Sequence, residues 1–145
     1  MRKKLIYGLF AGLLLFFMVG CATEGKSTAQ LTQKATYKIT LAGKASEPGV
    51  LSYAGYEMNV YKDQASNPCG DCPDQPVSFF VGTSAKEVVG KLAEATKKAD
   101  DLWDVQETTD SSITLVEKEI GTTKTPEKPS APAGLAVEGA YTPAR

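Results

Sequence analysis

The chain has no histidine, and its 145 residues carry no excess of basic side chains. Without an imidazole there is no Ser–His–Asp triad, no Cys–His dyad, no histidine-ligated zinc or haem and no imidazole general base. The 16 Lys and Arg residues against 17 Asp and Glu residues give a net charge of -1, which does not favour nucleic acid as a partner. P-loop and nucleophile-elbow motifs are absent as well. We therefore predict a protein that is not an enzyme, with no cofactor, no bound metal and no nucleic-acid partner.

The amino-terminal residues 1–20 have the order of a secretory signal peptide. Arg2, Lys3 and Lys4 precede an uncharged apolar run over 5–20. That run is shorter than the roughly 20 residues a helix needs to span a bilayer as a permanent anchor. The pattern predicts a signal peptide that is cleaved, with an uncleaved membrane helix as the alternative.

The apolar run ends in Met18-Val19-Gly20-Cys21, which resembles the lipobox of bacterial lipoproteins, although Met18 stands where Leu is usual. The resemblance implies cleavage before Cys21, a diacylglycerol on the Cys21 sulfur and an acyl chain such as palmitate on the new amino terminus. Two or more chains give stable anchoring. Ala22 is compatible with the outer membrane, facing the periplasm, if the cell is Gram-negative. We therefore predict a cell-envelope protein that contacts the membrane through the lipid on Cys21.

Composition divides the rest of the chain into three zones. Residues 21–35 are small and polar, which predicts a flexible, disordered spacer behind the lipid. Residues 36–121 carry the periodic apolar patterns and predict the folded domain. Residues 122–145 are rich in proline, which favours a disordered tail. A ligand for a proline-recognising partner and a cell-wall spacer are the alternatives for the tail.

Residues 36–121 are predicted to form a single small α+β domain, because apolar and polar residues alternate in six short segments around one helical segment. Tight turns are predicted at Ala54-Gly55 and at Thr109-Asp110-Ser111. We expect an antiparallel or mixed sheet of about six short strands, covered by one amphipathic helix. The predicted strands are 37–41, 50–53, 56–62, 77–81, 102–108 and 112–118.

The predicted helix begins at Ser84, which forms a capping-box pattern with Glu87. A single apolar stripe follows at helical spacing and predicts one buried face. Gly90 interrupts it with a residue of low helix propensity and suggests close packing against a strand. The stripe consists of Ala85, Val88, Val89, Leu92, Thr96 and Ala99.

The arrangement over residues 37–121 resembles a small domain of Mu-like phage tail sheath proteins. The pattern is carried by the strand Gly49–Leu51 with the turn at Gly55, the helix start over 81–89, and the last strand pair through 113–116. The resemblance implies the fold, and a functional alternative in which the chain is a component of a phage-like tail assembly. The loop from Cys69 to Pro76 has no counterpart in the pattern.

Cys69 and Cys72 form a C-x-x-C pair, for which four interpretations compete. Export to an oxidising compartment favours a structural disulfide. A redox site needs the first cysteine at a helix amino terminus, but prolines surround this pair. Zinc needs four ligands, and two thiolates with Asp71 and Asp74 form a weak set. Covalent haem needs a histidine where Pro73 stands.

Two further groups of side chains are candidate sites with plainer explanations. Asp100, Asp101 and Asp104 form an acidic cluster that could attract a cation, but the calcium-loop spacing is absent and a solvated turn is favoured. Aromatic residues could form a binding face, but at strand spacing they more often pack in the core. These aromatic residues are Tyr53, Tyr56, Tyr61, Phe79 and Phe80.

The sequence therefore predicts a lipid-anchored envelope lipoprotein whose domain is a non-catalytic binding or structural module, with an unknown envelope protein or ligand as its partner. The first alternative is a thiol-disulfide or metal-handling lipoprotein that uses Cys69 and Cys72. The second is the phage-like assembly implied by the fold resemblance.

Overall fold

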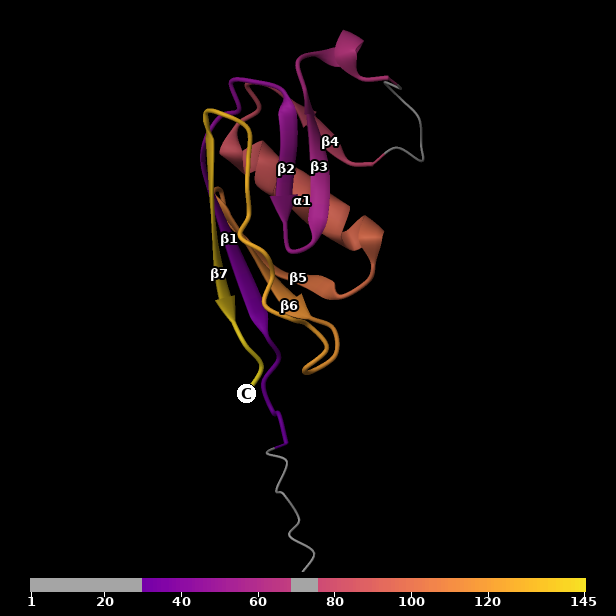
Figure 1. Cartoon of the computed structure of the whole chain (residues 1–145), viewed down its shortest axis with the longest axis vertical. Helices are drawn as coiled ribbons and strands as arrows, with labels where there is room; N and C mark the ends of the chain where they lie inside the picture. Colours follow the sequence, from indigo (N-terminus) through magenta and orange to yellow (C-terminus); the bar gives the residue numbers. More distant parts are fainter. Residues whose placement is uncertain (1–29, 69–75) are drawn as a thin grey trace, which may run out of the picture. The chain divides into compact units, whose positions relative to one another are not determined.

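Two β-sheets and one α-helix form the part of the chain that the structure, a computed structural model, describes: residues 30–68 and 76–145 (Figure 1). A four-stranded antiparallel sheet contains, in order, β5 (Trp103–Thr108), β6 (Ser112–Glu117), β1 (Thr36–Gly43) and β7 (Leu135–Thr142). A three-stranded sheet contains β2 (Gly49–Tyr53), β3 (Tyr56–Tyr61) and β4 (Ser78–Phe80). The helices are α1 (Ala85–Ala99) and the short 3-10 helix η1 (Gln64–Ser66).

The predicted α+β class with a single amphipathic helix is confirmed, but the strands form two sheets where the sequence predicts one. The physical reason lies in β1. Strand β1 pairs with β6 along one edge and with β7 along the other, so the β2–β3 hairpin has no edge of β1 to extend. The hairpin instead pairs with β4 and contributes buried side chains to the core from a second sheet.

One hydrophobic core joins both sheets and the helix. The alternation predicted for β1 is confirmed, because Tyr37, Ile39 and Leu41 are buried while the residues between them face outward. Burial of these apolar side chains is the main favourable term in folding. The core also contains Leu51, Tyr53, Met58, Val60, Phe79, Val88, Val89, Leu92, Trp103, Ile113 and Leu115.

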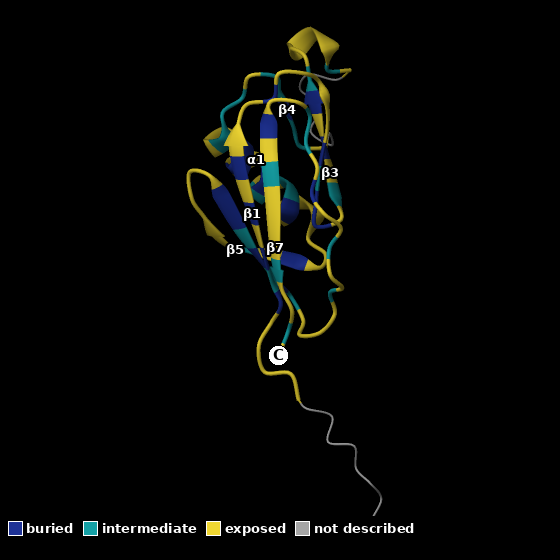
Figure 2. Ribbon diagram, turned by 60° about the vertical axis from the view of Figure 1, so that its left-hand side comes forward, coloured by how far each residue is buried: buried dark blue, intermediate teal, exposed yellow. Residues whose placement is uncertain are grey.

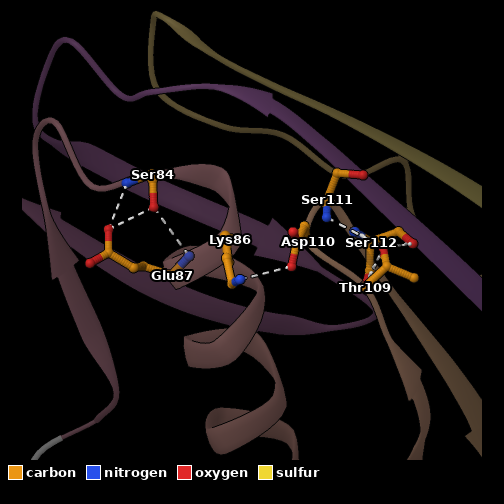
Figure 3. Close-up of polar contacts among 7 residues, drawn as sticks. All are labelled: Ser84, Lys86, Glu87, Thr109, Asp110, Ser111 and Ser112. Atoms are coloured by element: carbon orange, nitrogen blue, oxygen red, sulfur yellow. Dashed lines mark hydrogen bonds and ion pairs between the residues drawn. The ribbon is translucent and has the colours of Figure 1, made fainter.

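Helix α1 begins at the predicted cap. The backbone N–H of Glu87 donates to Ser84 Oγ at 3.4 Å, and the backbone N–H of Ser84 donates to the Glu87 carboxylate at 3.1 Å (Figure 3). Val88, Leu92 and Thr96 of the predicted stripe are fully buried. Thr96 is tolerated there because its hydroxyl donates to the Leu92 carbonyl at 2.9 Å.

Both predicted hairpin turns are present. Ala54 and Gly55 have positive φ angles of 49° and 87°, as in a type I′ turn. The twist of this turn matches the right-handed twist of the two strands that it joins. The turn between β5 and β6 is closed by Thr109, whose backbone N–H donates to the Ser112 carbonyl at 2.8 Å (Figure 3). Sequence alone located these turns because each depends on a few local residues.

The prediction of a disordered tail over 122–145 is wrong for residues 135–142, which form β7 along β1 (Figure 2). The prolines lie outside this strand, so every residue of β7 retains its N–H. Pairing with β7 satisfies backbone groups on the second edge of β1, which would otherwise have only water as a partner. The domain boundary moves accordingly, from the predicted 36–121 to a compact unit over Leu31–Arg145.

The amino-terminal boundary of the domain also lies earlier than predicted. Ala35, assigned to the spacer from its composition, is fully buried. The backbone N–H of Gln33 donates to the Arg145 carbonyl at 2.7 Å, and the N–H of Arg145 donates back to the Gln33 carbonyl at 3.1 Å. Residues 31–35 are therefore fixed by contacts that their own sequence does not reveal.

The expectation that Gly90 packs closely against a strand is wrong. Gly90 is exposed, and a Cβ built on it meets no heavy atom within 4 Å.

Gly90→Ala is therefore expected to raise the free energy of unfolding by about 0.5–1 kcal/mol, because alanine has the higher helix propensity. Urea denaturation measures the change. Gly139→Ala is the contrasting variant and should lower the free energy of unfolding, because the added Cβ would lie 2.1 Å from the Tyr37 hydroxyl. A lower free energy of unfolding for Gly90→Ala would contradict the open surroundings assigned to Gly90.

Candidate functional surfaces

The three cysteines singled out by the sequence lie outside the described residues. Cys21 precedes residue 30, and Cys69 and Cys72 fall in the segment 69–75. That segment belongs to the connection between β3 and β4, which pair in parallel and therefore need a long crossover. Lipidation at Cys21 and the disulfide between Cys69 and Cys72 stay predictions.

The acidic cluster after α1 is compensated by a lysine. Lys118 forms an ion pair with Asp100 and lies 3.9 Å from a carboxylate oxygen of Asp104. Its hydrogen bond to Asp100 raises the pKa of Lys118. Asp101 accepts a hydrogen bond from the Tyr56 hydroxyl, and burial together with this bond raises the pKa of Tyr56. Within residues 30–68 and 76–145, no three His, Cys, Asp or Glu residues form a group that could hold a metal ion.

The aromatic side chains divide between core and rim, as expected from their strand spacing. Tyr53 and Phe79 are buried in the core, and burial raises the pKa of Tyr53 to about 12. The Tyr53 hydroxyl donates to the Leu92 carbonyl at 3.3 Å, which links β2 to α1. Tyr56, Tyr61 and Phe80 are half-buried. The set is therefore spread over core and surface positions and forms no continuous exposed face.

Glu117, which the sequence analysis did not single out, is a fully buried carboxylate at the end of β6. It accepts hydrogen bonds from the backbone N–H groups of Ala35 at 2.7 Å, Gly121 at 3.0 Å and Thr123 at 3.3 Å, and from the Thr123 hydroxyl at 2.8 Å. Burial alone would raise its pKa, but these bonds outweigh burial and lower the pKa of Glu117 to about 2.

All of these bonds go to the chain itself, so Glu117 has a structural role. It fastens the start of the domain and the segment after β6 to the larger sheet. A signal for it exists in the sequence: Glu117 follows Ile113 and Leu115 at the spacing of the buried face of β6.

Open grooves flank α1 on both sides. The first, of about 370 Å³, lies between α1 and β5, and the second, of about 410 Å³, lies between α1 and β4. Lys86 and Lys97 border the first groove on the helix side, whereas Glu107 and Asp110 border it on the strand side. Lys86 spans its end in an ion pair with Asp110 at 3.1 Å (Figure 3).

The outer edge of β7 is a third surface feature. Val137 and Tyr141 are half-buried, and Gly139 between them is exposed. The Tyr37 ring of β1 covers Gly139, which leaves no room for a side chain at that position. The edge is therefore flat, and Glu138 carries its only charged side chain.

Within the described part of the chain, no helix has the length and hydropathy needed to cross a bilayer. No family model, curated protein or solved structure matches the chain significantly.

Proposed function

We propose that this protein is a lipid-anchored lipoprotein of the bacterial cell envelope, and that its α+β domain is a non-catalytic binding or structural module. The observation that carries the proposal is the order of three features along the chain. A positive, then apolar, segment ends in a lipobox-like Cys21, and a folded unit begins at Leu31.

The short connection between anchor and domain supports the proposal. Residues 22–30 span at most about 30 Å when fully extended, at about 3.3–3.6 Å per residue. Lipid on Cys21 would therefore keep the domain close to a membrane surface. The chain leaves the domain beside its carboxyl end, because Gln33 and Arg145 exchange backbone hydrogen bonds.

The buried titratable groups support a module without chemistry of its own. Glu117 is occupied by hydrogen bonds from Ala35, Gly121 and Thr123. The Tyr53 hydroxyl is engaged with the helix. Perturbed groups in an active site usually face a cleft, whereas Glu117 is enclosed by the segments that it holds together. Tyr53 borders a small surface pocket of about 140 Å³, but its hydroxyl bonds the helix.

The anchor is tested by Cys21→Ser in bacterial cells grown with an alkyne-tagged palmitate. The wild-type chain is expected to incorporate the label and to fractionate with membranes, and Cys21→Ser is expected to lose both properties. The matched control is the double variant Cys69→Ser, Cys72→Ser, which should retain the label. Mass spectrometry of the mature amino terminus gives the second readout; an unmodified Cys21, or a retained Met1, would refute the proposal.

A further inference from the structure

Strand β7 has a free edge with unused backbone groups. Lys44 N–H donates to the Gly134 carbonyl at 3.1 Å, in the same register that pairs β1 with β7. Hydrogen-bonded pairs recur at every second residue of an antiparallel ladder. Counting from Gly134, the residues of β7 that bond to β1 are the even-numbered ones. Val137, Gly139 and Tyr141 therefore direct their N–H and C=O groups away from β1. None of the three takes part in a backbone hydrogen bond outside the regular ladders of the described residues.

The other sheet edges are protected, which makes β7 the exception among the described strands. The ladder of β5 is broken by a register shift between Val105 and Glu107. The edge of β2 is covered where Ser52 and Ser130 exchange backbone hydrogen bonds of 2.9 and 3.1 Å. Strand β4 has only three residues. Bulges, covering segments and short strands are the usual protections against edge-to-edge pairing, and β7 has none of them.

We propose that two copies of this chain pair antiparallel through β7, with Gly139 of one copy opposite Gly139 of the other, so that two four-stranded sheets become one. In this register Val137 faces Tyr141 of the second copy. Three residues in each copy then use one N–H and one C=O apiece, for about six hydrogen bonds across the interface. Gly139 has no side chain, and the Tyr37 ring covers one of its faces. The two backbones can therefore approach closely at the centre of the interface.

The chemistry of β7 selects this register over its neighbours. Shifting the centre toward the amino terminus, onto position 138, would place Glu138 directly opposite its own copy, and like charges in facing positions repel. Shifting it the other way, onto position 140, would pair Val137 with Pro143, which has no N–H to donate. The Gly139-centred register avoids the Glu138 pair, and it places Pro143 opposite Leu135, whose N–H already donates to the Pro132 carbonyl at 3.3 Å.

Charge complementarity also favours a second copy as the partner. Glu138 would face Ala140 of the other copy, and Ala140 pairs with Lys38 of β1 within each copy. Glu138 and the Lys38 side chain of the second copy would therefore share one row on the exposed face, separated only by a small alanine. The two-fold symmetry forms this opposite-charge row twice.

The pairing sets how the anchors are placed. The two copies are related by a two-fold axis perpendicular to the sheet. Their Leu31 ends therefore lie at opposite ends of the joined sheet, and both tethers reach one membrane only when the strands lie along its surface. This placement rests on the proposed anchor, whereas the pairing itself does not. Edge pairing buries little area, so tethering to one surface would strengthen it by raising the effective concentration.

The test uses the full chain in cells, with a photo-activatable phenylalanine analogue in place of Ala136 on β7. Irradiation is expected to give a covalent dimer, and the same analogue in place of exposed Glu57 on β3 is the control that should not. A protein that stays monomeric from position 136, or that cross-links equally well from position 57, overturns the proposal.

Charge variants at Ala140 test the register. Ala140→Glu places two like-charged pairs across the interface and is expected to weaken the dimer about tenfold, whereas Ala140→Lys faces Glu138 and should preserve it. Adding Glu138→Lys to Ala140→Glu should restore pairing. Within one copy residue 140 adjoins Lys38, so we expect the monomer to tolerate Ala140→Glu better than Ala140→Lys. Circular dichroism of both variants checks that each remains folded. Equal effects of Ala140→Glu and Ala140→Lys refute this register.

Discussion

Glu117→Gln is expected to lower the free energy of unfolding by about 2–4 kcal/mol. The carboxylate accepts four hydrogen bonds in a fully buried position, and glutamine replaces one acceptor oxygen with an NH₂ group. That NH₂ would face donors from Thr123 or from the Ala35 and Gly121 backbone, which would then be buried without a partner. An unsatisfied buried donor costs about 1–3 kcal/mol. Chemical denaturation at neutral pH measures the change.

The same residue predicts a pH dependence with a defined sign. Its pKa is lowered from 4.5 to about 2 in the folded state, so the stabilisation is present above the unfolded-state value. Stability from Glu117 is therefore lost as the pH falls from about 4.5 toward 2, and Glu117→Gln should show a flatter stability profile across that window. The matched control is Glu119→Gln, an exposed site two residues away, which should change stability by less than about 0.5 kcal/mol. Identical profiles for Glu117→Gln and the wild type would contradict the fastening role.

Leu92→Ala is expected to lower the free energy of unfolding by about 2–5 kcal/mol. Leu92 is 0% exposed on the buried face of α1, where the helix contacts β1, β5 and β6. Truncation removes apolar burial and leaves a cavity that neighbouring side chains fill only in part. The hydrogen bonds that the Tyr53 and Thr96 hydroxyls donate to the Leu92 backbone carbonyl are retained, so the loss reports on packing.

Leu102→Ala is the control for this prediction, because it makes the same chemical change at a site that is 50% exposed. Its effect should stay below about 1 kcal/mol. Comparable losses at Leu92 and Leu102, measured in the same urea titration, would mean that the buried face of the helix is wrongly assigned.

Sequence reasoning succeeded where the determining interactions are local. The cap at Ser84, the turn at Ala54-Gly55 and the alternation in β1 each depend on residues within a few positions of one another. It failed at β7, where small residues and the nearby prolines masked an alternation carried by Leu135, Val137 and Tyr141. Strand β7 exists because β1, far away in sequence, offers it an edge.

The candidate surfaces show the same division. The lipobox-like end at Cys21 and the pair Cys69 and Cys72 are sequence patterns, and they lie outside the described residues. The free edge of β7 and the fastening by Glu117 have no complete signature in the sequence. Each requires partners from distant segments: Tyr37 over Gly139, and Ala35 at the Glu117 carboxylate.

By itself, the sequence determined the class of the fold, the limits of the helix and the turns, since these follow from hydrophobic periodicity and local backbone preferences. The division into two sheets, the extent of the domain from Leu31 to Arg145 and the ionised state of buried Glu117 were decided only by the tertiary structure. The reason is physical. Strand edges and buried acceptors are satisfied by whichever segments the folded chain brings to them, and those segments lie far apart in sequence.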